Sequence, residues 1–321
     1  MLLEEVMNVI DIIIPIYNSR EYICNCLDSV LSQTIVDKIN VYLIDDCSDC
    51  SYDDILKKYK KLNIFYYRLD KNSGPGVARQ YGLDHSNGKY ILFLDSDDVF
   101  ASSFSVSKLY EATNKSENVI VYGYVLIEHE DGNYEKLLTE GSLHGKLFCR
   151  KVIDKYNLRF YEGYSHEDLS FFILYAEANV ESIYIEDEVY IYKFNKKSIT
   201  KAYDDYFYSK SDEYVNNIIW FVENCESRDF NVVDIADNIY YAFVVLYNSY
   251  IKNYDKEDSN LVIEYSSRLM DLYNKYSVFL ADEDRKNLLE AYHTDIVPKI
   301  SFDEFFDLVK KFNDWLVVNL W

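Results

Sequence analysis

The sequence predicts an α/β protein whose core is a doubly wound, mostly parallel β-sheet. Short apolar runs rich in β-branched residues alternate with segments whose apolar residues recur at helical spacing, and this alternation favours parallel strands joined by helices. The run from Tyr90 to Leu94 is apolar at every position, as in a strand buried on both faces of such a sheet. Three carboxylates follow it directly, at Asp95, Asp97 and Asp98.

Turn-forming residues separate the expected elements of the first hundred residues. Asn18 and Ser19 can cap the first helix, Gly74-Pro75-Gly76 precedes the third, and Asn87-Gly88 leads into the last strand. The strands are expected over 9–16, 41–44, 64–69 and 90–94, and the helices over about 22–31, 52–59 and 77–85.

The regular alternation changes after the acidic turn. Residues 119–128 alternate toward Asp131-Gly132, a hairpin turn signal, and 134–138 can return as the second strand. A further strand is expected near 183–194. We therefore expect a small antiparallel element within a domain over 1–205, followed by a helical region over 206–321.

Composition excludes several classes of protein. The chain has 55 acidic and 33 basic residues, and its net charge of −22 repels the phosphates of nucleic acids and of anionic lipids. Met1–Glu5 lacks the basic start of a signal peptide, and no apolar run is long enough to span a membrane. We expect no nucleic-acid partner, and a cytoplasmic protein with reduced cysteines.

The six cysteines suggest one alternative, a zinc site. Cys24-x-Cys26 and Cys47-x-x-Cys50 supply thiols, which zinc prefers. Cys24 and Cys26 fall on an expected helix, however, where residues two apart point in different directions. The zinc site is therefore disfavoured.

The acidic turn at 95–98 is expected to bind a metal ion. Carboxylates this close repel one another unless a cation lies between them, and oxygen ligands suit Mg²⁺ or Mn²⁺. The turn follows a buried strand, at the edge where open parallel sheets bind ligands. A metal that holds a diphosphate is the functional interpretation, and an acidic loop or helix cap is the structural one.

Four segments occur in an order and spacing that point to one family. They read IIIPIYN, LIDDCS, GVAR and FLDSDD, at residues 12–18, 43–48, 76–79 and 93–98. They resemble the nucleotide-binding half of family 2 glycosyltransferases, which have the GT-A fold. Later motifs are matched at Lys146–Phe148, Glu167-Asp168 and 190–200, so the resemblance covers about residues 8–200. It implies an inverting, metal-dependent hexosyltransferase of bacterial polysaccharide synthesis.

The resemblance also implies a nucleotide-sugar donor, most simply a UDP-sugar, Mn²⁺ or Mg²⁺ as cofactor, and a glycan or lipid-linked glycan as acceptor. Pro15 and Tyr17 match nucleotide-binding positions, with Tyr17 stacking on the base. Asp46 matches the acid that hydrogen-bonds the uracil edge, whereas its neighbour Asp45 fits a turn-stabilising role. Asp97 and Asp98 match the pair that binds ribose and metal, and we expect Asp98 to be the direct metal ligand.

Arg79 leaves two interpretations open. It matches an arginine whose charge either neutralises phosphate or organises the acidic turn. The chain departs from the family at two positions. Gln80 stands where asparagine usually follows this arginine, and Cys47 replaces the glycine that usually follows the paired acids.

A rare cluster of cations follows the last expected strand. Lys193, Lys196 and Lys197 match a loop that closes over the diphosphate, with Ser198 and Thr200 as further donors. The alternative is a solvated basic turn.

Asp168 matches the family's catalytic base, within Ser165-His166-Glu167-Asp168. A carboxylate there would take the proton of the acceptor hydroxyl as it attacks opposite the leaving diphosphate, which inverts the sugar's configuration. His166 or Glu167 could instead be the base, and acids favoured at a helix N-terminus are the structural alternative.

Other functions fit the sequence less well. A sugar-nucleotide pyrophosphorylase or nucleotidyltransferase would need a Gly-rich basic loop after the first strand, where the chain has Pro15–Ser19. A phosphorylated acidic-pocket module would need a partner lysine for which the sequence offers no candidate. A non-catalytic partner subunit would not need Asp98 and Asp168.

The region over 206–321 carries apolar residues at helical spacing, which favours a core or a contact in a homo-oligomer. The alternative is an interfacial helix, with Trp315 and Trp321, that brings a peripheral enzyme to a lipid-linked acceptor at the inner membrane face. The residues are Tyr240, Phe243, Val244, Tyr247 and Ile251, and then Phe305, Phe306, Leu308, Val309, Phe312, Trp315 and Leu316.

Overall fold

The computed structural model describes residues 9–139, 141–163, 166–196, 211–228, 230–252, 259–279 and 301–319. The chain divides into two compact units, one up to Asn195 and one from Lys196 onward. The expected boundary at 205/206 falls within 197–210, which lies outside the described residues. Each unit is therefore considered by itself.

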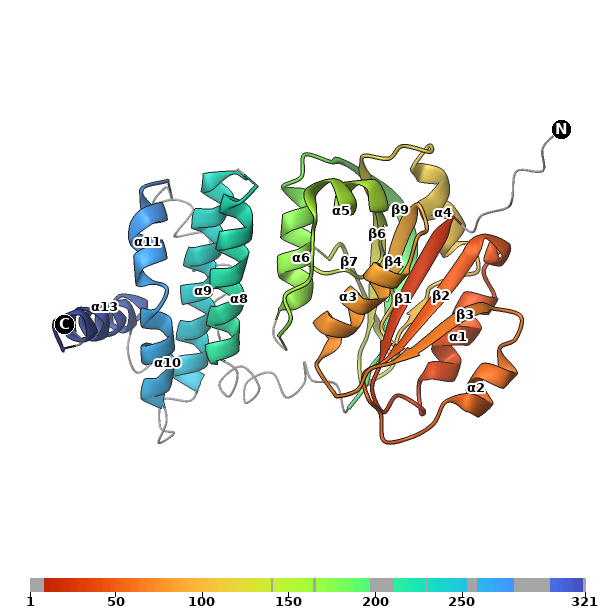
Figure 1. The fold of residues 1–321 in the computed structure, drawn as a ribbon, viewed down its shortest axis with the longest axis horizontal. Helices are drawn as coiled ribbons and strands as arrows, with labels where there is room; N and C mark the ends of the chain where they lie inside the picture. Colours follow the sequence, from red (N-terminus) through yellow and green to blue (C-terminus); the bar gives the residue numbers. More distant parts are fainter. Residues whose placement is uncertain are drawn as a thin grey trace. The chain divides into compact units, whose positions relative to one another are not determined.

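A mixed β-sheet forms the centre of the first unit (Figure 1). In the described residues it has nine strands in the order β3-β2-β1-β4-β8-β6-β9-β5, with β7 beside β6. Strands β1 to β4 pair in parallel, as predicted. The strands are β1 (Ile10–Ile16), β2 (Ile39–Asp45), β3 (Asn63–Arg68), β4 (Tyr90–Phe93), β5 (Val99–Phe100), β6 (Val119–Glu128), β7 (Tyr134–Leu137), β8 (Lys146–Cys149) and β9 (Glu181–Tyr192).

Helices cover both faces of this sheet (Figure 1). The connections through α1 and α2 run from β1 toward β3, and the connection through α3 runs back to β4 on the other side of β1. This reversal is the doubly wound arrangement, and it opens a crevice at the carboxyl ends of β1 and its neighbours. The helices are α1 (Ile23–Leu31), α2 (Asp53–Lys58), α3 (Pro75–His85), α4 (Ser105–Ala112), α5 (Arg150–Tyr156) and α6 (Glu167–Ala176), with the 3₁₀ turn η1 (Val36–Lys38).

The antiparallel part of the sheet is larger than predicted. The expected hairpin is present as β6 and β7, but β8 also pairs antiparallel with β4 and β6, and β5 pairs antiparallel with β9. β8 has only four residues, all buried, and such a short run carries no alternation that would reveal a strand.

The predicted cap of the first helix is wrong. α1 begins at Ile23, Tyr22 occupies the N-cap position, and no side chain caps the helix. Asn18 instead donates to Asp49, and the Ser19 hydroxyl donates to the carbonyl of Tyr17. These polar side chains organise the loop before the helix. Asn and Ser form such local hydrogen bonds in turns as readily as at helix N-caps.

An aromatic core fixes α6 against β4. Phe160 and Phe171 stack with their ring centroids 4.1 Å apart, and Phe93 of β4 meets both rings edge-on at 5.2 and 5.8 Å. Phe171 is fully buried. This packing sets the position of the N-terminus of α6 relative to the turn that follows β4.

The second unit is helical, as predicted. Its α9 residues at helical spacing, from Tyr240 to Ile251, are all buried, as are Phe305 and Val309 of α13, so these faces form a core. No helix among the described residues has the length and apolar composition needed to cross a bilayer. The elements are α8 (Ser211–Glu226), α9 (Val232–Lys252), α10 (Ser259–Ser267), α11 (Met270–Tyr276), η3 (Ser277–Phe279) and α13 (Phe302–Asn319).

A homo-oligomer, a membrane contact and a cytoplasmic location stay predictions. Trp321 lies outside the described residues, and the side chain of Trp315 is not described. Leu308 is 38% exposed on α13, in contrast to the buried Phe305 and Val309.

We predict that Gly88→Ala destabilises the first unit. A Cβ at this position would lie 2.6 Å from Cγ of the buried Asp11, whose carboxylate accepts the backbone N–H groups of Asn87 and Gly88. The turn must shift, at about 1–3 kcal/mol, and the urea midpoint should fall. An unchanged midpoint would show that the turn moves at no cost.

Candidate active site

Three parallel strands bring the predicted ligand residues to one edge of the sheet. Tyr17 follows β1, Asp46 follows β2, and the acidic turn at 95–98 begins just after β4. β1 lies between β2 and β4, with Ile16 beside Asp45. Pro15, within β1, is half-buried, whereas the Tyr17 ring is 47% exposed. The predicted ligand residues therefore lie together at the carboxyl edge of the parallel strands.

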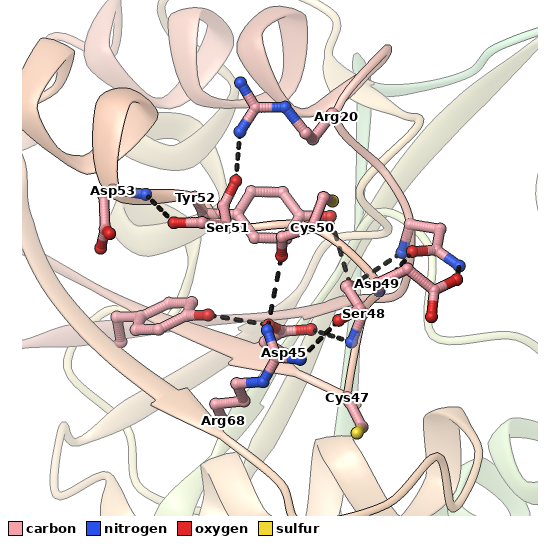
Figure 2. Close-up of polar contacts among 12 residues, drawn as sticks. Arg20, Asp45, Cys47, Ser48, Asp49, Cys50, Ser51, Tyr52, Asp53 and Arg68 are labelled. Atoms are coloured by element: carbon pink, nitrogen blue, oxygen red, sulfur yellow. Dashed lines mark hydrogen bonds and ion pairs between the residues drawn. The ribbon is translucent and has the colours of Figure 1, made fainter.

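The loop after β2 is built around a buried carboxylate (Figure 2). Asp45 is fully buried, and its Oδ1 accepts the backbone N–H of Ser48 at 2.8 Å. Its Oδ2 accepts the Tyr66 hydroxyl at 2.7 Å and Arg68 Nη1 at 3.1 Å. Asp45 therefore holds the turn, as predicted from its position.

The loops after β1 and β2 are joined by a reciprocal pair. Asn18 Nδ2 donates to Asp49 Oδ2 at 3.0 Å, and the Asp49 backbone N–H donates to Asn18 Oδ1 at 2.9 Å. Cys47 has a φ of 64°, so the left-handed turn for which glycine is usual is kept with a side chain in its place, at some strain. This junction fixes the backbone beside Tyr17.

Asp46 ties β2 to the loop before α3. It is buried, and its two oxygens accept the backbone N–H groups of Ser73 and Gly74 at 2.8 and 2.7 Å. Burial raises the pKa of this carboxyl, although both hydrogen bonds lower it. Each oxygen has a second lone pair, so a base edge can still be recognised there.

Arg79 lies between two carboxylates. Its Nη2 is 2.6 Å from Asp95 Oδ1, and its Nη1 is 2.6 Å from Glu167 Oε1. The Arg79 and Glu167 side chains are each 7% exposed. Burial alone would raise the pKa of Asp95, but Arg79 and His144 hold it well below its usual range. The geometry favours the interpretation in which Arg79 organises the acidic turn.

Glu167 and Asp168 differ in accessibility at the N-terminus of α6. Glu167 is buried against Arg79, and burial raises its pKa to about 7. Asp168 is half-buried. Burial lowers the pKa values of Arg79 and His144, but Asp95 raises both, and the charge of Asp168 adds a smaller contribution in the same direction. His166 has its pKa lowered to about 4 by burial. Asp168 is therefore the accessible acid of this segment.

Asp98, the expected metal ligand, is a deeply buried carboxylate. It is 1% exposed, and its oxygens accept the Tyr190 hydroxyl at 2.7 Å and the Lys193 backbone N–H at 2.8 Å. Burial raises its pKa to about 8, so this carboxylate needs a nearby cation to stay charged. Asp97 is half-buried, and its Oδ2 accepts Asn195 Nδ2 at 2.8 Å.

Asp95, Asp98 and His144 could hold a metal ion. Their ligand atoms all lie within 4.8 Å of one another, and carboxylate oxygens are the donors that Mn²⁺ and Mg²⁺ prefer. The buried, uncompensated Asp98 fits such an ion. His144 and Asn195 were not anticipated, because each stands alone in a segment with no pattern of ligand residues. No cysteine belongs to a possible metal group within the described residues.

The predicted basic loop is only partly visible. Lys193 Nζ lies 2.5 Å from Glu128 Oε1, so this cation has a carboxylate partner. Lys196 is exposed at the end of the described segment, and Lys197, Ser198 and Thr200 lie outside the described residues.

We predict that Arg79→Met lowers the free energy of unfolding by about 3–5 kcal/mol, because it leaves buried Glu167 without its partner charge. Urea denaturation measures the change. Arg20→Met is the matched control, since Arg20 pairs with Asp54 at the exposed surface and little change is expected. Equal effects in both variants would contradict the structural role of Arg79.

Comparison with known proteins places this chain in a family. Residues 11–173, just over half of the chain, match the family described as Glycosyl transferase family 2. An uncharacterized glycosyltransferase of Haemophilus influenzae is 27% identical over 262 residues, covering 77% of this chain and 98% of the relative. A poly(ribitol-phosphate) beta-glucosyltransferase of Bacillus spizizenii is 37% identical over 118 residues, covering 36% of this chain but only 18% of the relative.

Two solved structures share the fold. TarS 1-349 of S. aureus, in complex with UDP-GlcNAc, has a TM-score of 0.64 at 18% identity, covering 95% of this chain and 92% of that chain. Mannosyltransferase PcManGT of Pyrobaculum calidifontis, in complex with GDP-Man and Mn²⁺, has a TM-score of 0.53 at 12% identity, covering 96% and 88%. These likenesses confirm the predicted GT-A fold with C-terminal helices. With the family match, they establish that the chain belongs to glycosyltransferase family 2.

Proposed function

We propose that this enzyme transfers a sugar from a uridine diphosphate donor to an acceptor hydroxyl, with inversion and with a divalent metal ion. One observation carries the proposal. An exposed aromatic ring, an acidic turn that needs a cation, and an accessible carboxylate on α6 stand at one edge of the sheet. The ring can bind the nucleobase, a cation on the acidic turn can neutralise the leaving diphosphate, and the carboxylate can remove the proton of the acceptor hydroxyl.

The donor half of the proposal rests on the loops after β1 and β2. The Tyr17 ring is 47% exposed, and an aromatic face of this kind can stack on a nucleobase. Asp46 lies at the end of the neighbouring strand, where its carboxylate can accept from a uracil N–H. The UDP-GlcNAc bound by the structural relative TarS 1-349 supports a uridine donor.

The metal half rests on the acidic turn. Asp97 and Asp98 would hold Mn²⁺ or Mg²⁺, with Asp95 and His144 next to them. The bound ion would supply positive charge that stabilises the departing diphosphate. Tyr190 and the Lys193 backbone N–H orient Asp98, and Asn195 orients Asp97, so segments far apart in sequence shape the turn. Arg79 would hold Asp95 of the turn in place, and Lys196 and Lys197 would add positive charge near the phosphates.

Asp168 would be the general base. It is the accessible acid at the start of α6, whereas its neighbour Glu167 forms a buried ion pair with Arg79. Removing the hydroxyl proton during attack contributes roughly 10² to 10⁴ in rate. Attack from the Asp168 side, opposite the leaving diphosphate, would invert the anomeric configuration.

The acceptor is proposed to be a polymer hydroxyl. The Bacillus spizizenii relative is named for poly(ribitol-phosphate), and a phosphate-linked polymer presents many equivalent hydroxyls. A glycan or lipid-linked glycan offers the same chemistry at the reacting oxygen.

We predict that Asp168→Asn lowers the transfer rate by roughly 10² or more while nucleotide affinity changes little, because a general base acts on the acceptor. Single-turnover transfer and calorimetric titration with UDP measure the two quantities. Glu167→Gln and His166→Ala should each retain more activity. Near-normal transfer by Asp168→Asn, with an inactive Glu167→Gln or His166→Ala, would move the base to the neighbouring residue.

We predict that UDP binds in a metal-dependent way. Calorimetry should show binding with Mn²⁺ present, and Asp98→Ala should weaken it at least tenfold, about 1.4 kcal/mol. Asp37→Ala, which removes an acid from η1, is the control and should bind as the unmodified enzyme does. Equal UDP affinity with and without metal would reject the metal site.

A further inference from the structure

An open depression of about 500 Å³ lies at the edge of the sheet opposite the candidate active site. Its lining includes Lys89, in the turn before β4, and Arg150, Lys151 and Lys155 of α5. β4 begins at Tyr90 and leads to the acidic turn, so the depression and the active site lie at opposite ends of one strand. Strand geometry separates them by about 17 Å.

Cations outnumber acids in this depression. Its four basic side chains face one lining acid, Asp154, and Glu117 adds a second carboxylate that pairs with Lys89 at 3.3 Å and Lys151 at 2.8 Å. The chain as a whole has a net charge of −22. Because exposed charges are screened beyond about 8 Å at physiological salt, the local excess of cations decides what binds here.

Arg150 is held in place by neutral acceptors. Its Nε donates to the Gly88 carbonyl at 3.0 Å and its Nη1 to the Leu83 carbonyl at 3.3 Å, while Nη2 donates to Ser86 Oγ. Asp154 lies 3.8 Å away and is largely exposed. The guanidinium is therefore fixed and recessed, with its side chain 16% exposed, and its charge is only weakly compensated within the lining.

The other cations of the rim are only partly neutralised, because Lys89 and Lys151 share one carboxylate, Glu117. Lys155 Nζ lies 3.0 Å from the Tyr156 hydroxyl, a neutral partner, and no described carboxylate forms an ion pair with it. Lys151 is 70% exposed, so its ammonium can move onto a ligand. The buried Asp11 lies beneath the turn, where its carboxylate accepts the N–H groups of Asn87 and Gly88 and also interacts with the charge of Arg150.

We propose that this depression binds phosphate groups of an anionic acceptor polymer, an inference that rests on the proposed function. A recessed guanidinium with exposed lysines at the rim suits a phosphate that enters the depression. A flat lipid surface would reach only the protruding lysines. A polymer held here would present its hydroxyls to the active site at high effective concentration. This local attraction would offset the repulsion of polyanions by the net negative charge of the chain.

The test uses fluorescently labelled inorganic polyphosphate as the probe and the full chain as the protein. Lys151→Glu/Lys155→Glu should weaken polyphosphate binding at least tenfold in an anisotropy titration, and wild-type affinity should fall steeply with salt. Lys60→Glu/Lys61→Glu makes the same charge change at exposed residues after α2 and should leave binding unchanged. Circular dichroism checks that both variants fold.

Three results would overturn the inference. These are equal polyphosphate affinity in both double variants, tighter lysine-dependent binding to vesicles of anionic lipid, and equally tight lysine-dependent binding of single-stranded DNA. UDP titration with Mn²⁺ in the same samples separates this inference from the proposed function. If UDP binds and polyphosphate does not, only the proposed phosphate-binding role of the depression is rejected. If polyphosphate binds and UDP does not, only the proposed nucleotide site is rejected.

Discussion

The buried ion pairs of Arg79 hold the proposed active site together. One guanidinium contacts Asp95 of the acidic turn and Glu167 of α6, both at 2.6 Å. These carboxylates belong to segments more than seventy residues apart in sequence, and Asp168 is next to Glu167 in the same helical turn. The orientation of the proposed base relative to the proposed metal turn therefore depends on this cation, together with the aromatic packing of Phe93, Phe160 and Phe171. Because buried ion pairs repay their desolvation only with good geometry, this arrangement constrains the site more than it stabilises the fold.

A second constraint is the shortage of positive charge around the acidic turn. Asp95 is paired with Arg79 and His144. Within the described part of the chain, Asp98 accepts hydrogen bonds only from the Tyr190 hydroxyl and the Lys193 N–H, and of the cations only His144 partly offsets its burial. Burial therefore raises the pKa of Asp98 to about 8. A divalent cation would remove this penalty, and a diphosphate would then complete the charge balance. Under the proposed function, one buried carboxylate would couple metal binding to donor binding.

The sequence pattern predicted the parallel half of the sheet because apolar or β-rich runs over 9–16, 41–44, 64–69 and 90–94 alternate with segments at helical spacing. It also predicted the residues that follow those strands, since parallel strands deliver their carboxyl ends to one edge. β8 was missed because its four residues owe their strand conformation to neighbours on both sides. His144 and Asn195 were missed for the same reason, since tertiary pairing alone brings them to Asp95 and Asp97. Arg79 could not be assigned until the structure placed Glu167 against it.

The most direct test of the proposed site is a crystal structure with UDP and Mn²⁺, with the metal located by anomalous diffraction. The account predicts an anomalous peak within about 2.2 Å of an oxygen of Asp97 or Asp98, the uracil ring on Tyr17, and Asp168 facing the diphosphate across the crevice. An anomalous peak away from the acidic turn, or UDP bound in the basic depression at the opposite edge, would contradict it.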